Sequence, residues 1–448
     1  MEMILTGELG LVAIRYSPTS FAKLVSIDGS DNGGNGNGNG DGYTNVYADF
    51  CVFNPYLNKE DPSYYPTIKD AMAESSHCSE HRYTLPLNEV MSAIKNANVN
   101  NGKNGSSNSN NNKTGAMRTT TTTTTTKVRT LPLTGLLFHQ GHAGSGLLAN
   151  ILSYAYDSTH VISKHPALRD ALSACDVIRN RYRSEDNCSE DKRRRLIRDV
   201  IALLSRTSDD GSGAKGDTTG RVEHLFLRLD GASTAYLPDL RSMYPNVKWT
   251  FSYRNAEETL SKTMHRHHES HNNNSSSSIS SAVVSPPPPC AKSKRNPTTN
   301  LQQKSQQHNV ELEGLNHYQV CALQLSTLLD VALEEHEQSG GGSSGLLVSY
   351  EDVVKTSGRV FVDEVLPHFG LTQGDKLRNK RKYSINDGNN DKDFNMDRVA
   401  EMLSTKSNSR GKGKERGWDK SMEEDIVISE EVRDAVKLFM GGLMGESN

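Results

Sequence analysis

Residues 131–155 read LPLTGLLFHQGHAGSGLLANILSYA, and this stretch decides the fold. It contains a continuous apolar run, Gly135–His139, of the kind found in strands buried on both faces. A glycine-containing loop follows, and apolar residues then recur at helical spacing from Leu147 to Ala155. A strand, a glycine loop and a helix in this order let backbone N–H groups and the positive end of the helix dipole converge on an anion. The stretch therefore predicts a phosphate-binding loop.

The rest of the chain after residue 131 repeats this alternation of apolar runs and helical periodicity. Apolar runs at 160–163, 224–229, 248–253 and 346–349 predict further strands, and helical periodicity is clearest over 256–266, 317–335 and 360–368. Continuous apolar strands separated by helices predict an α/β domain of three layers, with a parallel sheet covered by helices on both faces. Ligands of such sheets bind where the strands end at their carboxyl edge. The functional residues are therefore expected in the loops that lead from strands into helices.

Composition limits how much of the chain can fold. Of the 448 residues only 34% are hydrophobic and the mean hydropathy is -0.64, and several tracts consist of Gly/Asn, Thr or Ser/Pro repeats. Such tracts cannot bury enough apolar surface to become ordered. We expect a small N-terminal α+β region of unknown role over 1–94, a low-complexity linker over 95–130 and the α/β domain over 131–448. A disordered insertion is expected at about 270–309 within that domain.

Charge and cysteine usage exclude several classes of protein. The chain has 51 Lys and Arg against 54 Asp and Glu, so it lacks the basic field of a nucleic-acid-binding protein. The six cysteines form no CxxC pair, which predicts reduced thiols in a cytoplasmic protein. No basic leader and no run of 18 apolar residues is present, so neither secretion nor a membrane span is expected. The run Arg193–Arg195 is interpreted as an exposed helix face.

The spacing of the glycine loop separates it from two common nucleotide-binding motifs. Gly141 and Gly146 match the two glycines of GxxxxGK[ST], but Leu147 and Leu148 occupy the Lys and Ser/Thr positions. The groups that would contact terminal phosphates and hold magnesium are therefore missing, which argues against an ATPase, GTPase or kinase. The GxGxxG pattern of dinucleotide-binding folds is also absent. A glycine-rich turn that binds no ligand remains the alternative interpretation of the loop.

Five segments of the chain resemble the P-loop sulfotransferase superfamily, in the branch whose loop reads FHxSRxGSTL followed by SEPPxL. They are residues 133–148, 161–168, 226–230, 243–255 and 347–352, in the order of the family. The resemblance implies a three-layer P-loop fold. It also implies transfer of a sulfuryl group from PAPS (3′-phosphoadenosine 5′-phosphosulfate) to a hydroxyl of a small-molecule or carbohydrate acceptor, with no metal.

The resemblance implies that the glycine loop holds the 5′-phosphosulfate, through residues Gly141, His142, Ala143, Gly144, Ser145 and Gly146. Two of these depart from the family pattern. His142 stands where a Lys or Arg contacts the bridging oxygen, so the imidazole, with an ordinary pKa of about 6.5, would have to be protonated to act in catalysis. Gly146 replaces a hydroxyl residue and removes a donor. A catalytically lapsed nucleotide-binding or interaction module is therefore the alternative function.

The 3′-phosphate is bound in the family by an Arg at a strand end and a Ser eight residues later. Arg254 fits the first position, and its alternative role is an ion pair with Glu257 or Glu258. The eighth residue after it is Lys262, whereas Ser261 is the seventh. Neighbouring helical residues are 100° apart, so both side chains cannot face one phosphate. Both remain candidates.

The general base of the family is a His or carboxylate near the acceptor hydroxyl. His165, beside Lys164 at an expected strand end, is the candidate here, and a capping or packing histidine is the alternative. Tyr350 and Glu351 are interpreted as structural support for the sheet edge. The basic run 410–420 resembles the late family element that closes over the 3′-phosphate.

Overall fold

The computed structural model describes residues 1–5, 9–16, 46–53, 67–103, 128–155, 159–176, 189–208, 223–272, 288–294, 297–356, 359–371 and 428–440. Within these ranges no helix has both the length and the apolar character needed to cross a membrane.

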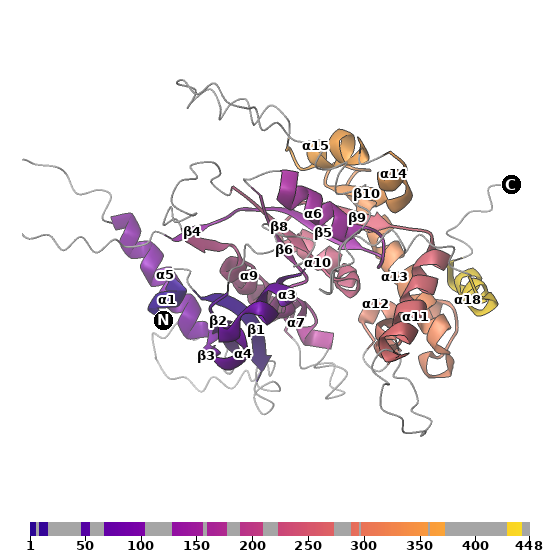
Figure 1. Ribbon diagram of the computed structural model, residues 1–448, viewed down its shortest axis with the longest axis horizontal. Coiled ribbons are helices and arrows are strands. Elements are labelled where there is room, and N and C mark those ends of the chain that lie inside the picture. Colours follow the sequence, from indigo (N-terminus) through magenta and orange to yellow (C-terminus); the bar gives the residue numbers. More distant parts are fainter. Residues whose placement is uncertain are drawn as a thin grey trace, which may run out of the picture.

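A five-stranded parallel sheet forms the centre of the molecule (Figure 1). Its strands, in spatial order, are β10 (Gly345–Ser349), β9 (Lys248–Tyr253), β5 (Leu133–His139), β8 (His224–Arg228) and β6 (Thr159–Ser163). Every neighbouring pair is parallel. The register places Arg228 opposite both Leu137 of β5 and Ser163 of β6. The ends of β5, β8 and β6 are therefore neighbours at the carboxyl edge of the sheet.

Alternating side chains of the strands supply two apolar layers. Leu136 and Phe138 belong to one buried cluster, and Leu137 of the same strand belongs to the other, as the two-residue period of a strand requires. The first layer includes α7 (Pro166–Leu172), α9 (Glu190–Leu204) and α10 (Leu237–Met243). The second includes α6 (Ser145–Ala155), α14 (Tyr350–Lys355), the π-helical turn η5 (Phe361–Val365) and α15 (Leu366–His368). The expected three-layer α/β class is confirmed.

A third apolar cluster joins helices beyond the end of β9. It contains α11 (Ala256–Asn272), α12 (Thr299–Gln307), α13 (His317–Gln338) and α18 (Glu430–Met440), with the short 3-10 helices η3 (Pro289–Lys294) and η4 (Leu312–Gly314). Elements α12 and η3 lie within the tract 270–309, where disorder was expected, so that expectation was wrong for its second half. The helix α12 is anchored by Leu301, which is buried in the cluster, and by Thr298, whose side chain caps its first turn.

The N-terminal residues form a small antiparallel sheet in the order β1 (Gly10–Tyr16), β2 (Val46–Cys51) and β3 (Tyr83–Pro86). Helices α1 (Glu2–Leu5), α3 (Ile68–Glu74), α4 (Ser76–Glu80) and α5 (Leu87–Lys103) accompany it, so α5 extends into the expected linker. The apolar residues of this N-terminal region belong to the same buried cluster as those of the first layer of the α/β domain. A two-stranded antiparallel pair, β4 (Val128–Thr130) and β7 (Arg206–Ser208), completes the fold.

The cysteines are paired, which corrects the expectation of reduced thiols. Disulfides join Cys51 to Cys78 and Cys290 to Cys321, and Cys175 is also disulfide-bonded. The two cysteines of each described pair lie 27 and 31 residues apart in sequence, so no short sequence motif predicts the pairing. Disulfides persist in oxidising compartments and are rare in the cytosol. The pairs therefore stand against the reducing setting that the sequence suggested.

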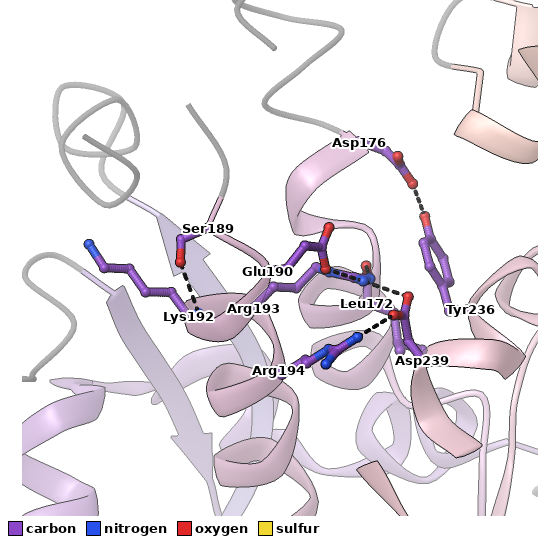
Figure 2. A network of polar contacts seen from close by, with 9 residues as sticks. All are labelled: Leu172, Asp176, Ser189, Glu190, Lys192, Arg193, Arg194, Tyr236 and Asp239. Atoms are coloured by element: carbon purple, nitrogen blue, oxygen red, sulfur yellow. Dashed lines mark hydrogen bonds and ion pairs between the residues drawn. The ribbon is translucent and has the colours of Figure 1, made fainter. Parts of the chain in front are cut away.

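Arg193 corrects a second expectation, because it does not belong to an exposed basic face (Figure 2). Its side chain is only 5% exposed and donates from Nε to Glu190 at 2.8 Å and from Nη1 to the carbonyl of Leu172 at 3.2 Å. It also pairs with Asp239, and its guanidinium lies over the ring of Tyr236. These contacts tie α9 to α7 and α10, so this arginine is a structural ion-pair centre.

Candidate functional site

The glycine loop between β5 and α6 has the backbone that an anion-binding turn requires. The φ angles of Gly141, His142 and Gly144 are 110°, 43° and 74°, all in the left-handed region that favours glycine. A Cβ atom at Gly144 would lie 2.6 Å from Cδ2 of Tyr350, so no side chain fits there. The loop ends at Ser145, the first residue of α6, whose N-terminus carries a partial positive charge.

Arg228 lies at the end of β8 and was not identified by the sequence reasoning. It is 8% exposed, and its Nε donates to Oγ of Ser145 at 3.1 Å. Among the described residues no carboxylate pairs with it. Burial lowers its pKa to about 10, so the guanidinium stays charged at neutral pH. A buried arginine without a carboxylate is costly unless an anion completes its environment.

Gly146 makes room for this arginine. A Cβ atom at Gly146 would lie 3.3 Å from Nη2 of Arg228, closer than nearly all real contacts of this kind. A side chain at this position would therefore require the guanidinium to shift by a few tenths of an ångström away from the first turn of α6. The sequence signal for Arg228 was a single arginine within the apolar run 224–229.

Three basic side chains, including that of Arg228, act on His139. His139 at the end of β5 is 5% exposed. Apart from the nearby backbone of Leu229, its ring nitrogens have no hydrogen-bond partner in the described part of the chain. Burial, followed by the charges of Lys164, Arg228 and His142, lowers the pKa of His139 well below its ordinary value. We call His139, His142, Lys164 and Arg228 the basic cluster. Within this cluster Arg228 has no carboxylate partner among the described residues, and an anion would offset its charge.

Arg254 reaches the loop, but its guanidinium is occupied. Its backbone N–H donates to Oε1 of Gln140 at 3.1 Å, which fixes the end of β9 against the loop. The side chain donates from Nε to Glu258 at 2.6 Å, lies 3.8 Å from Glu351 and stacks over Tyr350 at 4.4 Å from the ring centre. The alternative ion pair with Glu258 is therefore present. Tyr350 and Glu351 support this edge of the sheet.

Ser261 and Lys262 are both buried on α11, and Oγ of Ser261 has no hydrogen-bond partner among the described residues. The preceding turn of α11 faces the glycine loop, because a Cβ atom at Gly141 would lie 3.9 Å from Cγ2 of Thr259. The structure thus brings α11 beside the loop. It leaves the choice between Ser261 and Lys262 as a prediction.

His165 caps the start of α7, and both of its ring nitrogens are occupied. Nδ1 accepts from the backbone N–H of Ala167 at 3.2 Å, and Nε2 lies 3.0 Å from the carbonyl of Leu11, to which it donates in this tautomer. Burial lowers the pKa of His165 to about 4, although the hydrogen bond to Leu11 opposes this shift. The ring therefore has no nitrogen left to receive a substrate proton.

A cavity of about 190 Å³ lies among α7, α12, α13 and the segment that follows β8. Its lining includes Asp230, which is two residues after Arg228, a span of at most about 7 Å of chain. Oδ1 of Asp230 accepts from the N–H and the hydroxyl of Ser233 at 2.9 and 2.7 Å, and no hydrogen bond within the described ranges involves its Oδ2. Asp176 and Tyr236 line the same cavity and are hydrogen-bonded to each other.

The basic run 410–420 lies outside the described residues. Over the described ranges, no three His, Cys, Asp or Glu side chains are grouped so as to hold a metal ion.

Comparison with known proteins gives remote structural likenesses. No protein-family model matches the chain, and no curated protein does. Among solved structures, the chain is similar to the sulfotransferase domain of the Synechococcus PCC 7002 olefin synthase, with 10% identity, a TM-score of 0.30, and coverage of 69% of this chain and 95% of that domain. It is also similar to the sulfotransferase domain of the curacin biosynthetic pathway, with 11% identity, a TM-score of 0.30, and coverage of 69% and 92%.

Proposed function

We propose that the carboxyl edge of the central sheet binds PAPS and that the protein transfers its sulfuryl group to a hydroxyl-bearing acceptor. The observation that carries this proposal is Arg228, a buried charged guanidinium aimed at the first turn of α6 with only Ser145 as its described hydrogen-bond partner. A helix N-terminus, a left-handed glycine loop and a buried cation together form an anion site. PAPS supplies a sulfuryl group attached to a phosphate that can leave.

Arg228 can supply the positive charge and the hydrogen-bond donor that the sequence lacks at His142 and Gly146. His142 alone would be a weak cation at neutral pH, and Gly146 has no hydroxyl. A guanidinium beside Ser145 supplies a fixed positive charge where negative charge develops on the leaving phosphate, and stabilisation of this kind is a large term in such transfers. In the proposed complex Arg254 exchanges its pair with Glu258 for the 3′-phosphate, assisted by Ser261 or Lys262.

Asp230 replaces His165 as the proposed proton acceptor. Its Oδ2 has no described hydrogen-bond partner, it lines the cavity, and it follows Arg228 by two residues in the chain. A carboxylate within hydrogen-bonding reach of the acceptor hydroxyl can take its proton as the oxygen attacks sulfur. His165, with both nitrogens occupied, is assigned a structural role.

A second candidate function is nucleotide binding without turnover. The glycine loop favours it, because His142 and Gly146 stand where the resemblance expects a Lys or Arg and a hydroxyl residue that act on the leaving phosphate.

Isothermal titration calorimetry of the full oxidised chain against PAP (the desulfated product), with 5′-AMP as the comparison ligand, tests the proposal. We expect PAP to bind at least tenfold more tightly than 5′-AMP. Arg228→Gln should weaken PAP binding at least tenfold, or about 1.4 kcal/mol, whereas Arg228→Lys, which keeps the charge, should retain most of it. The matched control Arg359→Gln alters an exposed arginine and should bind as the wild type does.

The outcomes separate the two candidates. PAP binding with sulfate transfer from PAPS to an alcohol supports the transferase, and PAP binding without any transfer supports the lapsed module. If the folded wild-type protein binds no PAP, or if Arg228→Gln remains folded by circular dichroism and binds PAP normally, the site is not the one proposed.

A further inference from the structure

Ser163 is the last residue of β6 and lies directly beside Arg228 in the sheet. The two residues are opposite each other in the register of β6 and β8, and the N–H of Lys164 donates to the carbonyl of Arg228 at 2.7 Å. Ser163 is 1% exposed, and its Oγ has no hydrogen-bond partner among the described residues. A buried hydroxyl without a partner is unfavourable, so a ligand that accepts a hydrogen bond from it removes that cost.

The side chain of Ser163 lies on the face of β6 that α6 covers (Figure 1). Alternate residues of a strand share one face of the sheet, so Thr159, Val161 and Ser163 have the same direction. Oγ1 of Thr159 donates to the carbonyl of Leu152 in α6 at 2.6 Å, and Val161 belongs to the buried cluster that contains α6. No shift of register interrupts the pairing of β6 with β8. The hydroxyl of Ser163 therefore faces the α6 side.

The N-terminus of α6 lies near the level of Ser163. The helix connects β5 to β6, and a crossover helix between parallel strands returns antiparallel to them. From the contact between Thr159 and Leu152, the strand rises about 13 Å to Ser163, and the helix extends about 10 Å in the same direction to Ser145. Arg228, the neighbour of Ser163, donates to Ser145, which agrees with this placement.

We propose that Ser163 donates a hydrogen bond to the 5′-phosphate of the nucleotide, and this inference rests on the proposed PAPS site. Gly146 stands where the resemblance expects a hydroxyl donor to this phosphate, and the guanidinium of Arg228 lies next to it. Ser163 flanks the same arginine from β6. Arg228 supplies charge and N–H donors, and Ser163 adds the hydroxyl that the loop lacks. Negative charge develops on this phosphate as the sulfuryl group leaves, so a donor here also favours transfer.

Ser153 on α6 provides a matched control. It is 2% exposed, and its Oγ likewise has no hydrogen-bond partner among the described residues. It lies eight residues after Ser145, about 12 Å along the helix and away from the glycine loop. Ser153 and Ser163 are therefore alike in burial and in hydrogen bonding, and they differ in their distance from the proposed phosphate.

Calorimetry on the full oxidised chain with PAP and with adenosine 3′-phosphate tests the inference, because the two ligands differ only in the 5′-phosphate. We expect Ser163→Ala to reduce the preference for PAP at least fivefold, since a hydrogen bond to a charged acceptor is lost. The affinity of this variant for adenosine 3′-phosphate should stay within about twofold of the wild type. Ser153→Ala should change neither affinity.

Thermal unfolding without ligand gives a second measurement. Ser163→Ala and Ser153→Ala each remove a buried hydroxyl that has no described partner, so neither variant should unfold at a lower temperature than the wild type. A lower unfolding temperature in Ser163→Ala alone would show that its hydroxyl already bonds within the protein, and it would overturn the inference.

The binding results separate this inference from the proposed function. If the wild type binds PAP and Ser163→Ala keeps the full preference for it, the inference is wrong and the transferase proposal stands. An equal loss of affinity for both ligands also overturns the inference, because it indicates a general disturbance of the site. A folded wild type that binds no PAP overturns the proposed PAPS site, and the role of Ser163 falls with it.

Discussion

His165 connects the N-terminal sheet to the α/β domain, and its hydrogen bonds predict a specific dependence of stability on pH. Its ring caps α7 through Ala167 and contacts the carbonyl of Leu11 in β1. The contact with Ala167 requires the neutral ring, because a protonated Nδ1 cannot accept. The perturbation is His165→Asn, because asparagine can still accept from the first turn of α7 but cannot reach as far toward Leu11.

The magnitude follows from the pKa of His165, which is lowered from 6.5 to about 4. The unfolded chain therefore takes up a proton first as the pH falls, and the wild type loses stability from about pH 6.5 down to about pH 4. The loss attributable to this one residue is about 2 kcal/mol at pH 5, and on the order of 3 kcal/mol once the pH falls below 4. Near pH 7.5 the variant should instead be the less stable protein, by about 1–3 kcal/mol, because the carbonyl of Leu11 has lost its donor.

Urea denaturation of the wild type and His165→Asn, followed by tryptophan fluorescence between pH 4.5 and pH 8, measures the effect. The stability difference between the two proteins should shrink as the pH falls and approach zero or change sign near pH 5. Other buried histidines contribute to both proteins and cancel in the difference. A stability difference that stays constant over this range would refute the reasoning.

Two further predictions concern backbone and covalent restraints. Gly144→Ala places a Cβ atom 2.6 Å from the ring of Tyr350 at a φ of 74°, so we expect a loss of about 1–3 kcal/mol. The control Gly314→Ala meets no atom within 4 Å and should be nearly neutral, and equal thermal shifts for the two variants would contradict this account. Replacing Cys290 and Cys321 by serine opens a link between residues 31 apart, which should lower the free energy of unfolding by about 3–4 kcal/mol in a urea titration without reductant. An unchanged urea midpoint would show that this disulfide does not constrain the chain.

The sheet could be predicted from the sequence because its strands are buried on both faces. The expected strand 248–253 coincides with β9, and the expected strand 224–229 exceeds β8 by one residue. Helix α13 was expected over 317–335 and extends three residues further, to Gln338. It could be predicted because its apolar period persists through most of its length. Where local pattern and tertiary packing agree, periodicity is sufficient.

The remaining features depend on neighbours that are distant in sequence. Arg228 looks like any polar end of an apolar run until the strand order places it between β5 and β6, against Ser145. The sequence left His165 as either a base or a capping histidine, because its partner Leu11 lies 154 residues earlier in the chain. The cysteine pairs likewise depend on which helices and strands meet in space, which spacing alone does not reveal.

The position of α18 near the end of the sequence affects how the protein folds during translation. Its residues Val432, Val436 and Phe439 complete the buried cluster on α11 and α13, and the Phe439 carbonyl accepts from the hydroxyl of Ser326 at 2.9 Å. At about 5–20 residues per second, a ribosome needs roughly 3–14 s to travel from residue 372 to residue 440. Throughout that interval the apolar faces of α11 and α13 that pack against α18 have no helix to contact. A chaperone that shields this surface during translation would therefore raise the yield of folded protein.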